Sequence, residues 1–124
     1  MRCPYEPRKG GFEAYFYAGS LEYPVEEKAR LAKIFEAVPI STVDMYLDRP
    51  GVLIDIAGQA AALIVNYGSS ADASLDVIFG NALPEGKPPF DLPRSMGAVE
   101  KSMEDVPFST ESPLFRFGHG LRYR

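Results

Sequence analysis

Apolar residues recur with a helical period between residues 24 and 38 of this 124-residue chain. The spacing i, i+3, i+4, i+7 places four of them on one face, which we expect to be buried: Leu31, Ile34, Phe35 and Val38. Pro24 suits the first turn of a helix, and Pro39 ends it. The pattern predicts an amphipathic helix at residues 24–38.

Alternation of apolar and polar residues predicts a strand at residues 41–47, with Val43, Met45 and Leu47 on one face. After a break at residues 48–51, residues 52–58 predict a short helix or helical turn. Residues 60–66 predict a second strand that is apolar on both faces. This pattern is typical of an interior parallel strand covered on both sides.

A third helix is predicted after the second strand. Ser69 and Asp72 form a plausible capping pair at its start, and Gly80 suits the position after its last turn. We expect its buried stripe to consist of Leu75, Ile78 and Phe79. Strands that alternate with helices through short connections predict an α/β fold with a parallel sheet and helices on its faces.

The chain length allows one domain at most. Prolines and glycines cluster near the N-terminus and at residues 83–94, which is typical of long ordered loops. Residues 1–23 therefore read as an aromatic loop region and residues 81–124 as an extended C-terminal tail. Within the tail, residues 90–92 predict a short strand and residues 96–102 a short helix. We expect the tail to wrap around the body on which it packs.

Charge and cysteine content exclude several classes of function. A net charge of −4 and a pI near 5.0 argue against nucleic acid as a partner. Cys3 is the single cysteine, so neither an internal disulfide nor a cysteine-rich zinc site is expected, and we expect no metal and no cofactor. The start lacks the apolar segment of a signal peptide, and the run at residues 60–65 is far shorter than the ~20 residues of a membrane span. We therefore expect a cytoplasmic protein with no membrane partner.

Two stretches of the last third carry recognisable motifs. Residues 76–90 read D-V-I-F-G-N-A-L-P-E-G-K-P-P-F, and residues 113–123 read P-L-F-R-F-G-H-G-L-R-Y. The first resembles the D-[VA]-[LI]-F-G-x-x-x-P-x-G-[KR]-x-P-[FV] signature of glycoside hydrolase family 3, and the second resembles the ending of that family's domain. Further stretches resemble other family segments in the same order: residues 2–8, 20–23, 46–52 and 61–70.

The resemblance implies the C-terminal part of a β-glucosidase-like or β-xylosidase-like hydrolase. Members of the family have an N-terminal barrel, which carries an aspartate nucleophile, and a C-terminal three-layer α/β/α sandwich with a mostly parallel sheet. This sequence matches only the last part of that sandwich, so the barrel and its nucleophile are missing. Residues 1–124 are therefore expected to form a single partial domain of this type.

The family places its general acid/base glutamate in a loop after a sandwich strand, and many members read G-E-x-x-Y-x-E there. The corresponding residues 2–6 read R-C-P-Y-E, which makes Glu6 the candidate, although the Gly-Glu pair is absent. The alternative is a solvated loop glutamate. Glu13 and Glu22 are weaker candidates. The loop aromatics would surround such an acid, stack on a sugar ring, or simply pack in a core or interface: Phe12, Tyr15, Phe16 and Tyr17.

Three other residues invite a functional interpretation, and each has a structural alternative that we favour. His119 lies between two glycines where the family often has Tyr or Phe, which favours packing over catalysis. Arg49 is expected to anchor a turn by pairing with a carboxylate rather than to contact a sugar. Asp76 is expected to be an exposed helix residue or the partner of an arginine rather than a substrate ligand.

Two functions remain open at this stage. The chain is either a part of a glycosidase, inactive alone, that binds a glycoside when assembled with a barrel-bearing partner, or a non-catalytic structural or carbohydrate-binding module that forms a homo-oligomer. A shortened parallel sheet leaves an unpaired edge, so both hypotheses predict a partner. A third hypothesis, a decayed product that folds marginally, is disfavoured by the helix caps and the periodic faces.

Overall fold

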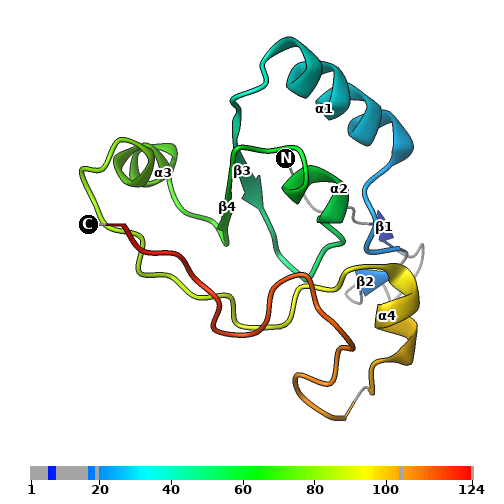
Figure 1. Ribbon diagram of the computed structural model, residues 1–124. Coiled ribbons are helices and arrows are strands. Elements are labelled where there is room, and N and C mark those ends of the chain that lie inside the picture. The colour runs from blue at the N-terminus through cyan, green and yellow to red at the C-terminus, as the bar shows by residue number, and fades with distance from the viewer. Residues whose placement is uncertain (1–5, 8–16, 19, 104, 124) are drawn as a thin grey trace.

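The computed structural model describes residues 6–7, 17–18, 20–103 and 105–123 (Figure 1). Its elements are β1 (Glu6–Pro7), β2 (Tyr17–Ala18), α1 (Val25–Ala37), β3 (Thr42–Tyr46), α2 (Ile54–Ala57), β4 (Ala62–Asn66), α3 (Ala71–Ile78) and α4 (Met96–Lys101). Every helix and strand predicted between residues 24 and 80 is confirmed, with ends that differ by a few residues.

The centre of the molecule is a parallel pair formed by β3 and β4. The register runs from Thr42 opposite Ala62 to Tyr46 opposite Asn66. Helix α2 connects the two strands, as a parallel pair requires a crossover connection. The predicted alternation of β3 is confirmed at its end, since Met45 and Leu47 are fully buried.

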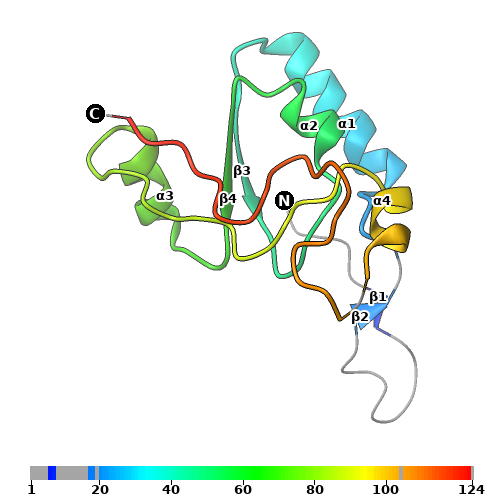
Figure 2. The same ribbon diagram turned by 60° about the horizontal axis from the view of Figure 1, so that its bottom comes forward.

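Helices lie on both faces of this pair. Helices α1 and α2 contact each other on one side, and α3 lies on the opposite side (Figures 1 and 2). The arrangement confirms the predicted α/β class. One layer holds α1 and α2, the middle layer holds β3 and β4, and the third holds α3.

The hydrophobic core joins segments between residues 23 and 92. It consists of Tyr23, Leu31, Phe35, Met45, Leu47, Leu53, Ile56 and Leu92. The stripe predicted for α1 is therefore only half buried: Leu31 and Phe35 are in the core, whereas Ile34 is 42% and Val38 52% exposed. Leu31 and Phe35 lie one above the other at i and i+4, and the narrow sheet covers no more of the helix than that row.

Strand β4 is less buried than its apolar sequence predicts. Ala62 is exposed and residues 63–66 are half-buried. Within the described residues β4 pairs with β3 alone. Two strands are too few to place β4 in the interior of a sheet, so the interior position predicted for this strand is not seen in the described residues.

Helix α3 also departs from its prediction. Its apolar residues Leu75, Ile78 and Phe79 are 46%, 40% and 75% exposed, and the buried residue of the helix is Ser74. The stripe was predicted from spacing alone, and the described part of the sheet is too small to cover it. The end of the helix agrees with the prediction, since Gly80 has a left-handed φ of 77°.

The N-cap of α3 is Ser70, one residue beyond the predicted Ser69. Its Oγ accepts a hydrogen bond from the Ala73 N–H at 3.3 Å. Ser70→Ala is expected to lower the free energy of unfolding by about 1 kcal/mol, because this N–H loses its acceptor. Urea denaturation measures the loss. Ser70→Asp, which keeps an acceptor, is the control, and an equal loss in both variants would contradict the assigned cap.

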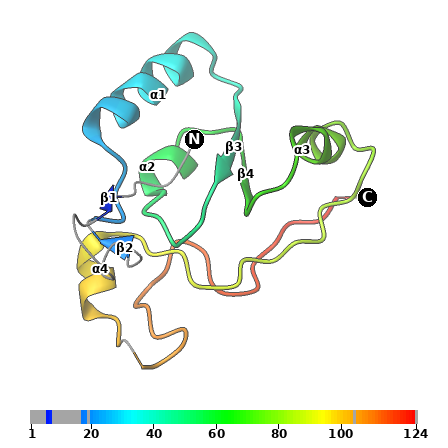
Figure 3. The ribbon, with the colours of Figure 1, turned by 180° about the vertical axis from the view of Figure 1, so that it is seen from behind.

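The C-terminal tail folds back on itself and closes the core. The Leu92 N–H donates to the Phe115 carbonyl and the Leu114 N–H to the Leu92 carbonyl, both at 2.8 Å. The strand predicted at residues 90–92 is thus a single antiparallel bridge. The two arms of the tail that this bridge joins run side by side in Figure 3. Because Leu92 is only 2% exposed, the tail packs on the body as predicted.

Strands β1 and β2 form a short antiparallel ribbon, with Glu6 opposite Ala18 and Pro7 opposite Tyr17. The ribbon lies near α4 in all three views (Figures 1, 2 and 3). The predicted aromatics Phe12, Tyr15 and Phe16 lie outside the described residues. Among the helices of the described part, none is both long and apolar enough to cross a membrane.

Candidate functional site

The backbone of Glu6, the predicted acid/base, is held in the β1–β2 ribbon. Its partner Ala18 lies two positions before Ser20, where the described chain continues. The segment Ser20–Glu22 follows the ribbon in the chain, and its contacts are described next. The role of Glu6 stays a prediction, and the alternative Glu13 lies outside the described residues.

The turn after β3 holds the segment Ser20–Glu22 from one side. The Val52 N–H donates to the Leu21 carbonyl at 3.0 Å, and Glu22 and Val52 form a parallel bridge. The Arg49 guanidinium donates from Nη2 to the Ser20 carbonyl at 3.3 Å. Arg49 thus anchors this segment through a backbone carbonyl, a contact that the sequence interpretation did not foresee.

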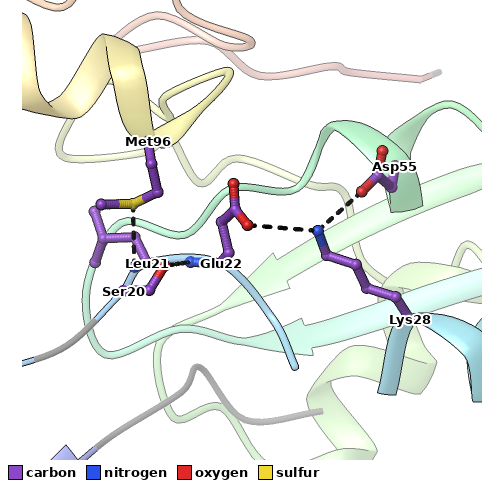
Figure 4. A network of polar contacts seen from close by, with 6 residues as sticks. All are labelled: Ser20, Leu21, Glu22, Lys28, Asp55 and Met96. Atoms are coloured by element: carbon purple, nitrogen blue, oxygen red, sulfur yellow. Dashed lines mark hydrogen bonds and ion pairs between the residues drawn. The ribbon is translucent and has the colours of Figure 1, made fainter. Parts of the chain in front are cut away.

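Helix α4 holds the same segment from another side. The Leu21 N–H donates to Sδ of Met96, the first residue of α4, at 3.3 Å (Figure 4). The two residues are 75 positions apart. Sequence reasoning did not single out Met96, and no local motif marks it, because a thioether acceptor has no characteristic spacing from its donor.

Glu22, the second weaker candidate, belongs to a row of three charges. Lys28 Nζ lies 4.0 Å from Glu22 Oε2 and 3.1 Å from Asp55 Oδ2, so the ammonium group links the segment to α2 (Figure 4). These contacts give Glu22 a structural role at the start of α1.

A second polar region joins the middle of β3 to the carboxyl end of β4. The Asn66 side chain donates to Asp44 Oδ1 at 2.7 Å, and its own Oδ1 accepts from the Gly68 N–H at 3.1 Å. The connections that follow β3 and β4 leave toward opposite faces of the pair, which is the position where open α/β sheets bind ligands. This contact could have been predicted by pairing the two expected strands, because the register places Asn66 diagonally across from Asp44 on the same face.

An aromatic contact borders this edge of the sheet. The rings of Tyr67 and Phe90 meet edge to face with centroids 5.8 Å apart. Burial raises the pKa of the Tyr67 phenol above its usual 10.0, so its hydroxyl stays protonated at neutral pH. Tyr67 thus offers a protonated hydroxyl next to Asn66 in sequence, at the end of β4.

The remaining candidates have structural contacts. His119 is exposed and stacks on Phe115 with centroids 4.9 Å apart, which agrees with the packing role favoured from sequence. Asp76 is exposed on α3, and its Oδ1 accepts from the Asn81 side chain at 3.3 Å. In the described part of the chain, no group of three His, Cys, Asp or Glu residues is placed to hold a metal ion.

Comparison with known proteins gives close relatives over almost the whole chain. It is 58% identical over 121 residues to Beta-glucosidase C of Emericella nidulans and 60% identical to Probable beta-glucosidase C of Aspergillus oryzae. Each alignment covers 98% of this chain and 19% of the relative. Periplasmic beta-glucosidase/beta-xylosidase of Dickeya chrysanthemi is 33% identical over 95% of this chain and 18% of that protein. No family model matches the chain.

The fold and the comparisons together define an α/β chain with a glycosidase ancestry. It is homologous to one segment of β-glucosidases and of a β-glucosidase/β-xylosidase, and it spans about a fifth of the length of these relatives.

Proposed function

We propose that the chain is the C-terminal part of a family 3 glycoside hydrolase and takes part in cleavage of β-glucosides or β-xylosides. The observation that carries the proposal is the 58% identity to Beta-glucosidase C over 98% of this chain. The motifs at residues 76–90 and 113–123 support it. The whole activity requires the part of such an enzyme that this chain does not match.

The proposed chemistry divides two carboxyl groups between two parts of an enzyme. A retaining glycosidase places them about 5–5.5 Å apart, one to attack the anomeric carbon and one to transfer the proton. The resemblance assigns the attacking aspartate to a barrel, and we assign the proton transfer to Glu6. Glu6 would protonate the leaving oxygen and then deprotonate the water that releases the sugar. Alone, the chain is expected to be inactive.

The exposed apolar surface around α3 supports a covering partner. Leu75, Ile78 and Phe79 are joined there by Leu83 at 57% exposure. The Tyr123 hydroxyl donates to the Val77 and Ala82 carbonyls and holds the end of the tail on this helix, where Leu121 is 79% exposed. Large apolar patches of this kind mark interaction sites. The proposed occupant is the barrel-bearing remainder of the enzyme, since the relatives extend well beyond the matched segment.

A chimera tests the proposal. This chain replaces the matching 121-residue segment of Beta-glucosidase C of Emericella nidulans. We expect the chimera to hydrolyse p-nitrophenyl β-D-glucopyranoside, whereas the isolated chain and the relative without its segment do not. The chimera can supply both carboxyl groups, and neither control can.

A chimera that folds, by circular dichroism and sedimentation, yet shows no hydrolysis would overturn the proposal. The alternative non-catalytic module would then be favoured, provided that the isolated chain sediments as a dimer or larger oligomer. In that case a second copy of the chain would cover the α3 surface.

A further inference from the structure

We propose that residues 108–112, together with Phe117, form a carbohydrate-binding site for a β-linked gluco-oligosaccharide. Phe108 and Phe117 stack on sugar rings, and a charged hollow beside Ser112 binds sugar hydroxyl groups. Only the choice of glucose units rests on the proposed function. The segment belongs to the orange part of the loop that follows α4 in Figure 1.

Two phenylalanine rings lie against each other at the surface. The centroids of Phe108 and Phe117 are 4.3 Å apart, with an angle of 34° between the ring planes. This contact does not bury them, since the two residues remain 52% and 54% exposed. The C–H groups on one face of a β-glucose ring form a flat apolar surface, and these weakly positive groups pack on the negative face of an aromatic ring. The exposed pair therefore offers a stacking surface for a sugar.

The backbone that presents this surface is strained at two positions. Phe108 and Ser112 have left-handed φ angles of 59° and 44°, and in the described part of the chain they are the two residues other than glycine with a positive φ. Such conformations are costly for a residue with a Cβ atom, and they cluster in segments that hold ligands. Two of them within five residues indicate a segment that is shaped for binding.

Hydrogen bonds hold this segment in place. The Met103 N–H donates to Ser109 Oγ at 3.1 Å, and Ser102 Oγ, at the end of α4, lies 3.3 Å from Thr110 Oγ1. On the other side, Arg94 donates from Nε to the carbonyl that precedes residue 113 at 3.3 Å. The segment is therefore preorganised, and a ligand that stacks on it loses little conformational entropy through ordering the loop.

An open hollow of about 310 Å³ lies at the other end of the segment, and its lining includes Arg94, Lys101, Glu111 and Ser112. An anion in this hollow would meet Glu111, and a cation would meet Arg94 and Lys101. Neutral hydroxyl groups both donate and accept hydrogen bonds, so they match this mixture of charges. Phe108 and Ser112 are four positions apart, so their Cα atoms are separated by at most about 14 Å. A short oligosaccharide spans that distance.

Titration of the isolated chain with cellotetraose, followed by two-dimensional ¹H–¹⁵N NMR, measures the binding. We expect saturable shifts at the amides of residues 108–112 and 117–118. Phe108→Gly is expected to lower the affinity about tenfold, because it removes the stacking ring. The variant should still fold, since glycine adopts a left-handed φ without strain. Phe108→Tyr keeps the ring and should keep the affinity within about twofold.

A second exposed ring provides the matched control. Phe79 is 75% exposed at the end of α3, so Phe79→Gly removes an equal ring outside the proposed site and should leave the affinity unchanged. Equal losses in Phe79→Gly and Phe108→Gly would overturn the proposal, and so would shifts that rise linearly with ligand concentration. Inorganic phosphate is the competing probe. If phosphate saturates the amides of residues 111–112 and cellotetraose does not shift them, the hollow is an anion site and the proposal fails.

Sedimentation of the same variants tests a protein partner as the alternative occupant. Absence of saturable shifts with cellotetraose, combined with loss of self-association in Phe108→Gly, would assign the rings to a protein interface. The measurement is also independent of the proposed function, because it uses the isolated chain and no hydrolysis. An active chimera with an isolated chain that does not bind cellotetraose would overturn the site alone. Binding by the isolated chain with a folded but inactive chimera would overturn the proposed function alone.

Discussion

Glu6→Gln in the chimera is expected to lose about 100-fold to 10,000-fold in kcat/KM on alkyl β-glucosides, because an alkoxide leaving group needs a proton from the general acid. Gln preserves the shape of the side chain and cannot transfer a proton. The loss should be much smaller for aryl glucosides with acidic phenols, which leave without protonation. The dependence of rate on leaving-group pKa therefore becomes steep in the variant.

Azide provides the diagnostic rescue for this prediction. A general-base variant accumulates the glycosyl-enzyme intermediate, and a small anionic nucleophile attacks it without deprotonation, so azide should accelerate turnover and yield a β-glucosyl azide. Glu22→Gln and Glu26→Gln serve as controls. Glu22 is paired with Lys28, and Glu26 is exposed in the first turn of α1. If Glu6→Gln keeps full activity and Glu13→Gln shows the rescue, the acid/base is Glu13.

Local patterns predicted the elements because each depends on neighbours in sequence. The helix at residues 24–38 was found from its period and its flanking prolines, and α1 occupies Val25–Ala37. The strand at residues 41–47 was found from alternation, and Met45 and Leu47 lie in the core. These signals come from the geometry of a single element, which the rest of the fold does not alter.

Burial of whole faces could not be predicted in the same way. The apolar stripe of α3 and the apolar run of β4 were expected to be covered, but in the described structure the stripe is exposed and β4 is only half-buried. A pattern shows which face of an element is apolar, but not which segment covers it. The relatives extend well beyond the segment that this chain matches, and a covering segment from such a region has no trace in the pattern of this chain.

The candidate site was predictable only in part. Glu6 came from resemblance, since a glutamate after a strand has no spacing that marks it as an acid. The Asp44–Asn66 contact follows from the strand register once β3 and β4 are paired. The Leu21–Met96 contact joins residues 75 positions apart through a loop and a tail with no periodicity, so only the structure brings them together.

Leu53→Ala is expected to lower the free energy of unfolding of the isolated chain by about 2–5 kcal/mol. Leu53 is fully buried, and its carbonyl accepts from Ile56 and Ala57 at the start of α2, so the site cannot collapse freely around a smaller side chain. Leu121→Ala is the matched control. That leucine is 79% exposed, and a change within about 0.5 kcal/mol is expected. Urea unfolding followed by circular dichroism measures both.

The size of this loss would also show whether the site and the core unfold together. The core cluster includes Tyr23, which follows the segment Ser20–Glu22, and Leu92 from the tail, so a cavity at Leu53 lies in the core that both segments share. If they form one cooperative unit, Leu53→Ala should accelerate exchange of the Leu21 amide as much as that of the β3 amides. Faster exchange in β3 alone would contradict that coupling and make the segment Ser20–Glu22 a separate unit held by Met96 and Arg49. Leu53→Val, with a smaller cavity, extends the test if the alanine variant does not fold.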